Sequence, residues 1–235
     1  DALPARADVV LVTPSWQYPS GGRMPIARRL ALLDWARRAG AVIVEDDCEG
    51  ELRHSGPPLP ALQGMAEDGR VLYLNTFSKV LFPGLRTGYL VAPDAHRELL
   101  LAAVEAGARP PGAVEQRALG RFLESGAYVR HLRRVRSLLA ARRSAFRDEL
   151  DRASKGRLRV RAGEVGGHLI VDLGPNESAT AVAADLLRRG VRVEPLSANR
   201  TLAGGPDRAL VVYLSRVDEA GLRESARRLA AVAAP

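Results

Sequence analysis

The sequence has little of several residue types that mark other classes of protein. It contains one cysteine, Cys48, in 235 residues, which excludes an internal disulfide framework and suits a reducing cytoplasm. No run approaches the roughly 18–20 apolar residues of a membrane span, and no signal peptide is recognisable. His131 and His168 lack metal-ligand spacing with Cys48, so we expect no metal site.

Lysine is also scarce, although the chain is basic. Only Lys79 and Lys155 are lysines among 35 basic residues, and the net charge is +8. Arginine in an alanine-rich background is weak evidence for nucleic-acid binding. A lysine kept at position 79 against this bias favours chemistry that guanidinium cannot do, because only an amine that loses its proton forms a Schiff base. The alternative is a plain surface lysine after a strand.

The first half alternates apolar runs with helical periodicity. Strands are predicted at 8–12, 41–44, 71–75 and 88–91. A helix is predicted to begin near Pro25 and end at Gly40, with Ile26, Leu30 and Leu33 on one face. This order is typical of a parallel sheet with helical crossovers.

The second half is mainly helical before it returns to short strands. A long helix over 128–150 carries an apolar stripe, and its arginines fall elsewhere, as a solvated face would. Further elements are helices at 94–105, 114–123, 180–189 and 219–232 and strands at 157–160, 168–173, 191–194 and 210–214. The stripe comprises Tyr128, Leu132, Val135, Leu139, Phe146 and Leu150, and the arginines are Arg130, Arg133, Arg134 and Arg147.

Reactive side chains follow the predicted strands. Asp46 ends one strand, where a lone carboxylate needs a partner such as a protonated pyridine nitrogen. Lys79 follows the next strand. Thr76 and Ser78 are placed to hydrogen-bond a phosphate, and the charged guanidinium of Arg86 is placed to bind it through two N–H groups. Because the ends of successive strands meet at one edge of a sheet, these residues are expected to lie together.

Several blocks resemble a known family. The chain is similar to the second half of a fold-type-I pyridoxal-phosphate (PLP) enzyme, most closely to the aminotransferase-like domain of MocR-type regulators in the GntR family. The blocks that carry the resemblance are 13–21, 28–33, Glu45-Asp46-Asp47, Leu59-Pro60-Ala61-Leu62-Gln63-Gly64, 76–89, 109–111, Leu123-Glu124-Ser125-Gly126 and 130–134.

The resemblance implies an α/β fold in two parts. Residues 1–125 would be the C-terminal part of the large PLP-binding domain, with its mainly parallel sheet, and residues 126–235 the long connecting helix and a small α+β domain. It also implies site roles. Lys79 would be the Schiff-base lysine, Asp46 the pyridinium partner, and Thr76, Ser78 and Arg86 the phosphate-side residues.

Some positions depart from the family. Trp16 stands where histidine is usual, and Cys48 where a tyrosine normally hydrogen-bonds the cofactor, so we expect a perturbed rather than a lost cofactor linkage. The strand at 210–214 lacks the arginine that binds substrate carboxylates in aminotransferases. Arg200, Arg208 and Arg216 remain as alternatives, and the sequence does not choose among them.

Three functions remain open. The favoured one is an effector-sensing domain of a transcription regulator, with PLP on Lys79 and an amino compound bound as an external aldimine. The protein would be a cytoplasmic homodimer that binds DNA only through a winged-helix domain upstream of this chain. The alternatives are a catalytic PLP-dependent aminotransferase, or a specialised-metabolism relative of one, and a degenerate scaffold of the same fold.

Overall fold

The computed structural model describes residues 3–56, 59–107, 112–161, 163, 165–199 and 205–233. It divides the chain into two compact units. The first comprises Asp1–Gln17 and Gly22–Arg133, and the second comprises Tyr18–Gly21 and Arg134–Pro235. The boundary between Arg133 and Arg134 falls inside helix α5 (Ala127–Ser154).

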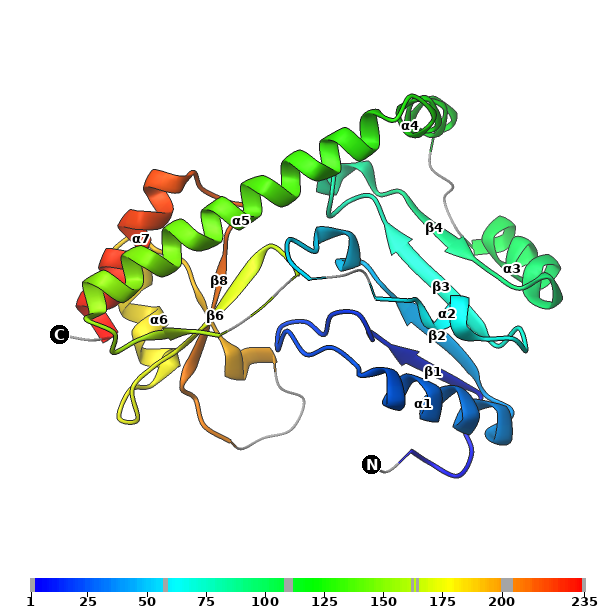
Figure 1. The fold of residues 1–235 in the computed structure, drawn as a ribbon, viewed down its shortest axis with the longest axis horizontal. Coiled ribbons are helices and arrows are strands. Elements are labelled where there is room, and N and C mark those ends of the chain that lie inside the picture. The colour runs from blue at the N-terminus through cyan, green and yellow to red at the C-terminus, as the bar shows by residue number, and fades with distance from the viewer. Residues whose placement is uncertain are drawn as a thin grey trace. The chain divides into compact units, whose positions relative to one another are not determined.

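The first unit is built on a four-stranded sheet whose strands lie in chain order (Figure 1). They are β1 (Val9–Val12), β2 (Val42–Asp46), β3 (Val71–Thr76) and β4 (Gly88–Val91). The first three pair in parallel, as predicted, whereas β4 is antiparallel to β3. The short connection over 77–87 explains the difference, because a parallel pairing needs a longer crossover.

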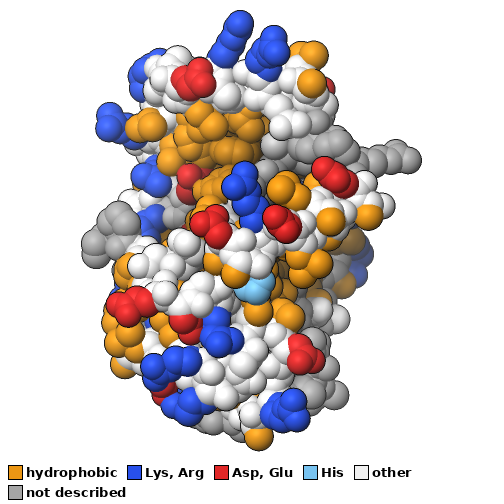
Figure 2. Space-filling view, turned by 90° about the vertical axis from the view of Figure 1, so that its right-hand side faces the viewer, with side chains coloured by type: hydrophobic (Ala, Val, Ile, Leu, Met, Phe, Trp, Pro, Cys, Tyr) orange, Lys and Arg blue, Asp and Glu red, His pale blue; other side chains and the backbone are white. Residues whose placement is uncertain are grey.

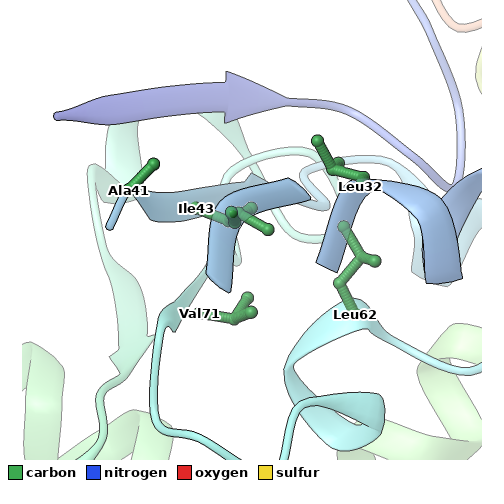
Figure 3. Close-up of a cluster of buried hydrophobic side chains, with 6 residues drawn as sticks. Leu32, Ala41, Ile43, Leu62 and Val71 are labelled. Atoms are coloured by element: carbon green, nitrogen blue, oxygen red, sulfur yellow. The ribbon is translucent and has the colours of Figure 1, made fainter. Parts of the chain in front are cut away.

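Helices α1 (Ile26–Ala39) and α2 (Leu62–Met65) supply the core of this unit. Figure 3 shows Leu32 and Leu62 beside three side chains of the sheet region, Ala41, Ile43 and Val71. Of the residues expected on one face of α1, Leu33 packs against the core, whereas Ile26 is 44% and Leu30 53% exposed. The buried positions are Arg29, Leu32 and Ala36, because the polar contacts of Arg29 turn that face inward.

Helices α3 (Asp94–Gly107) and α4 (Ala113–Glu124) complete the first unit, and neither has a fully buried residue within the described part of the chain. Figure 2 shows the side that carries them, where hydrophobic side chains gather in a hollow. Exposed apolar residues on β4 and α3 include Leu90, Val91, Leu99 and Val104. This side therefore presents apolar surface to solvent.

The second unit is an α+β arrangement. Its sheet has the order β5-β6-β8-β7, all antiparallel, and its core includes Phe146, Leu186, Leu210 and Leu222. The strands are β5 (Arg159–Val160), β6 (His168–Asp172), β7 (Glu194–Pro195) and β8 (Ala209–Tyr213), and the helices are α6 (Ala179–Arg188) and α7 (Glu219–Ala233).

Most predicted elements of this half are confirmed. The apolar stripe of the long helix is buried or half-buried, and its four named arginines are exposed. The strand predicted at 191–194 is wrong except for Glu194, because the Val191 N–H bonds to the Leu186 carbonyl and so extends the end of α6. The strand predicted at 157–160 begins only at Arg159, because the Arg157 N–H bonds to the Ser154 carbonyl.

Among the helices that the structure describes, none is both long and apolar enough to cross a lipid bilayer. The described residues also hold no cluster of three histidine, cysteine or acidic side chains arranged for a metal ion.

Candidate functional site

The loop after β3 fixes where Lys79 points. Phe77 and Val80 are buried, and the Val80 carbonyl lies 2.9 Å from His131 Nε2. The Phe77 ring packs edge-on against Tyr128, with centroids 5.7 Å apart. Between these anchors, the Lys79 side chain is 54% exposed. The loop is thus held by its buried residues while the lysine faces outward.

The Lys79 amine meets the turn that follows β2. Its Nζ lies 3.4 Å from Glu49 Oε1, and Glu49 comes three residues after Asp46. The Asp46 Oδ1 accepts a hydrogen bond from the Cys48 N–H at 3.0 Å, which closes this turn on itself. The structure therefore brings Lys79 to the Asp46–Glu49 turn.

The pKa of the Cys48 thiol depends on both Asp46 and Lys79. Burial raises its pKa to about 12, and the hydrogen bond and charge of Asp46 add to the rise, while the Lys79 ammonium opposes it. The thiol therefore lies within the electrostatic reach of both Asp46 and Lys79. At neutral pH it stays protonated.

The hydroxyl residues are tied to the neighbouring backbone. Thr76 Oγ1 accepts from the Ser78 N–H at 3.1 Å and donates to the Thr87 carbonyl at 3.3 Å. Arg86, which precedes Thr87, is exposed. Its φ is 50°, a left-handed conformation that costs energy for a residue with a side chain. Gly88 is needed here, since a Cβ on it would lie 2.5 Å from the Asn75 carbonyl oxygen. Arg86 thus stands next to the residue that Thr76 contacts.

Sequence reasoning did not find the second aspartate's role. Tyr73 donates its hydroxyl hydrogen bond to Asp47 Oδ2 at 2.9 Å, and Asn75 donates to the Tyr73 oxygen at 3.0 Å. Burial raises the pKa of Asp47, against the hydrogen bonds from Tyr73 and Ser15. Tyr73 and Asn75 alternate on β3 and so share a face, which is the signal that could have revealed them.

Sequence reasoning also missed a buried arginine that holds the loops behind the site. Arg29 donates to three carbonyl oxygens, those of Met24, Pro60 and Pro14, at 2.7–3.0 Å. Its guanidinium lies 4.0 Å from Glu45 Oε1, and both side chains are fully buried. Arg29 thereby fixes the 13–17 loop at the end of β1.

Glu45 completes this support. Its two carboxylate oxygens accept the N–H groups of Leu62 and Gln63 at 2.9 and 3.0 Å. Burial raises the pKa of Glu45, while these two hydrogen bonds and Arg29 lower it. Because Glu45 and Asp46 are adjacent on β2, anchoring Glu45 to α2 also fixes where Asp46 stands. The Pro60–Gln63 block thus has a structural role.

Three arginines were considered as carboxylate ligands, and all of them come well after Lys79 in the sequence: Arg200, Arg208 and Arg216. Strand β8 carries no arginine, and its residues Val211 and Val212 are buried. Arg200 and the 109–111 block lie outside the described residues. Arg208 and Arg216 are both exposed, and Arg216 stacks on Tyr213.

The mixed sheet of the first unit, the long helix and the α+β second unit define the fold-type-I aminotransferase class. The α-aminoadipate aminotransferase of Thermus thermophilus, solved with N-(5'-phosphopyridoxyl)-L-leucine, matches with a TM-score of 0.79 and 31% identity, over 94% of this chain and 57% of that one. The kynurenine aminotransferase of Pyrococcus horikoshii matches with a TM-score of 0.80 and 29% identity, over 96% and 55%.

The profile of the family described as aminotransferase class I and II matches residues 2–229, and the chain belongs to that family. It is 38% identical over 222 residues to the pyridoxine biosynthesis transcriptional regulator PdxR of Corynebacterium glutamicum, covering 94% of this chain and 48% of that protein. It is 33% identical to the probable rhizopine catabolism regulatory protein MocR of Rhizobium meliloti, covering 94% and 45%. The chain spans about half the length of these curated relatives.

Proposed function

We propose that this chain is the PLP-binding, effector-sensing part of a MocR/GntR-type transcription regulator, with the cofactor carried as a Schiff base on Lys79. The observation that carries the proposal is the outward-facing Lys79 amine, 3.4 Å from Glu49 on the turn that begins at Asp46. One of only two lysines in the sequence is thus set beside the acidic end of the neighbouring strand.

The donor set fits the chemistry of PLP. An exposed amine suits the aldehyde, a carboxylate suits the protonated ring nitrogen, and hydroxyls with a guanidinium suit the phosphate. When bound, PLP supplies an aldehyde for covalent capture of amines and a cationic ring that withdraws electrons. Lys79 and Asp46 would hold the first two groups, and Thr76, Ser78 and Arg86 the phosphate.

Cys48 makes this site weaker than a site with a phenol. A thiol whose pKa is about 12 stays protonated and donates only a weak hydrogen bond. Cys48 would therefore hold the ring less firmly than the tyrosine it replaces, while Asp46 and Lys79 keep their roles. This supports a sensor that binds its cofactor reversibly.

The second candidate function is catalytic transamination. It is supported by the likeness to solved aminotransferases at about 30% identity. Strand β8 carries no arginine, although such an enzyme would bind the substrate carboxylate with an arginine on this strand, and this difference favours the regulator. Steady production of a keto acid from a defined amino donor would favour the enzyme. If neither keto-acid production nor covalent trapping of PLP on Lys79 is observed, the degenerate scaffold remains.

The partners follow from the regulator proposal. The effector would be a small amino compound that exchanges onto the cofactor. The whole protein would act in the cytoplasm as a homodimer and contact DNA through a winged-helix domain outside this chain. The apolar residues exposed on β4 and α3 supply surface for such further packing.

The experiment is covalent trapping. The chain is incubated with PLP, reduced with borohydride, digested and mapped by mass spectrometry. A single adduct on the Lys79 peptide is expected, with none on Lys155, which serves as an internal control. Lys79→Ala should abolish the adduct, and equal labelling of both lysines would contradict the proposal.

A further inference from the structure

The second unit contains a small cavity beside the short strand β7. Its volume is about 260 Å³, just below the range of roughly 300–1,000 Å³ typical of sites for drug-sized ligands. Its lining combines buried apolar residues with charged residues that are exposed or half-buried. The buried residues are Phe146, Val212, Leu222 and Leu229, and the charged ones are Arg192, Glu194 and Arg216.

One of these arginines is held in place by an aromatic ring. The Arg216 Cζ lies 5.6 Å from the centroid of Tyr213, a cation–π distance. The Tyr213 hydroxyl donates to Glu194 Oε2 at 2.9 Å and lies 2.5 Å from the Tyr18 hydroxyl. Burial, with these two neighbours, raises the pKa of Tyr213. The ring is therefore a fixed, neutral platform under the guanidinium.

Several arginines of this unit are paired with carboxylates. Arg161, Arg188, Arg223 and Arg228 each form an ion pair with a nearby carboxylate. No such pair forms for Arg192 or Arg216 among the residues that the structure describes. Because Glu194 is the one acidic residue of the lining, the cavity carries an excess of positive charge.

We infer that this cavity binds a small molecule with a carboxylate on a short apolar body, and that Arg216 binds the carboxylate. A planar guanidinium already positioned by Tyr213 suits a forked contact to two oxygens. The apolar lining formed by Val212 and Leu222 suits a branched aliphatic group. The inference goes beyond the proposed function and does not require a cofactor on Lys79.

The test is a calorimetric titration of the 235-residue chain with isocaproate. Two ligand controls separate the contributions: isoamylamine has a similar apolar body with the opposite charge, and acetate has the carboxylate without the body. Saturable binding of isocaproate is expected, at least about tenfold tighter than that of either control.

Variants locate the site. Arg216→Ala should weaken isocaproate binding about tenfold or more. Arg216→Lys, which keeps the charge but cannot make the bidentate contact, should weaken it less. Arg208→Ala, at the opposite end of β8 and equally exposed, should leave it unchanged. Unaltered circular dichroism spectra establish that each variant is folded. Equal losses in the Arg208 and Arg216 variants, equal binding of the amine, or no saturation by isocaproate would each overturn the inference.

Discussion

Lys79 Nζ lies 3.4 Å from Glu49 Oε1, and the lysine side chain is about half exposed while the glutamate is mostly covered. The Lys79 amine is thus held beside a carboxylate of the turn that follows β2. Glu49 is therefore a positioning residue for Lys79.

Removing that carboxylate should free the Lys79 side chain. In Glu49→Gln the amine loses the ion pair that holds it over the turn after β2, so Lys79 should become more accessible and acylate faster, by less than about fivefold because a half-exposed pair contributes under about 1 kcal/mol. Quantitative mass spectrometry of the Lys79 peptide measures the rate. Glu51→Gln is the matched control, since Glu51 contacts the Tyr128 hydroxyl instead. A Lys79 rate that is the same in both variants and in the original chain would count against a positioning role.

The single cysteine reports on the same site. Because the pKa of Cys48 is raised to about 12, alkylation by iodoacetamide at pH 8 should be hundreds of times slower, to order of magnitude, than in the urea-unfolded chain. The folded rate should then climb with pH up to about 12. Asp46→Asn removes a charge that opposes ionisation, so it should accelerate alkylation. Alkylation at the unfolded rate, at neutral pH, would mean that Cys48 is not buried against Asp46.

The buried pair behind the site should dominate the stability of the first unit. Arg29→Met leaves Glu45 buried without its cation and frees three carbonyls, so we expect a loss of about 3–5 kcal/mol in the free energy of unfolding. Glu45→Gln should cost less, about 1–3 kcal/mol. Urea denaturation measures both, and the double variant should lose less than the sum because the two residues interact. An Arg29→Met chain as stable as the original would refute this role.

Acid stability should depend on Asp207. Its carboxylate accepts hydrogen bonds from the Ser197 and Ser178 hydroxyls and the Thr180 N–H, with Ser197 the largest cause of a pKa lowered to about 2. A lowered folded-state pKa gives stability that is present above about pH 4 and is lost as the pH falls toward 2. Asp207→Asn should therefore flatten the acid limb of the denaturation curve in that window. Asp185→Asn, which removes the ion pairs with Arg188 and Arg189 instead, is the control, and identical acid limbs for all three proteins would contradict the assignment.

The sequence was sufficient to place side chains at the ends of neighbouring strands. Asp46 ends β2 and Lys79 follows β3, and these two strands are neighbours. The Arg29–Glu45 pair could not be found this way, because hydrophobic periodicity treats an arginine as a solvated residue. Its burial depends on carbonyl partners at Pro14 and Pro60, which come together only in three dimensions. The stacking of Arg216 on Tyr213 was hidden for the same reason.

Borohydride trapping of PLP on the intact chain tests the central claim most directly. The predicted result is a reduced adduct confined to the Lys79 peptide, absent in Lys79→Ala and weakened in Asp46→Asn. No adduct at all, or one distributed equally between Lys79 and Lys155, would contradict it.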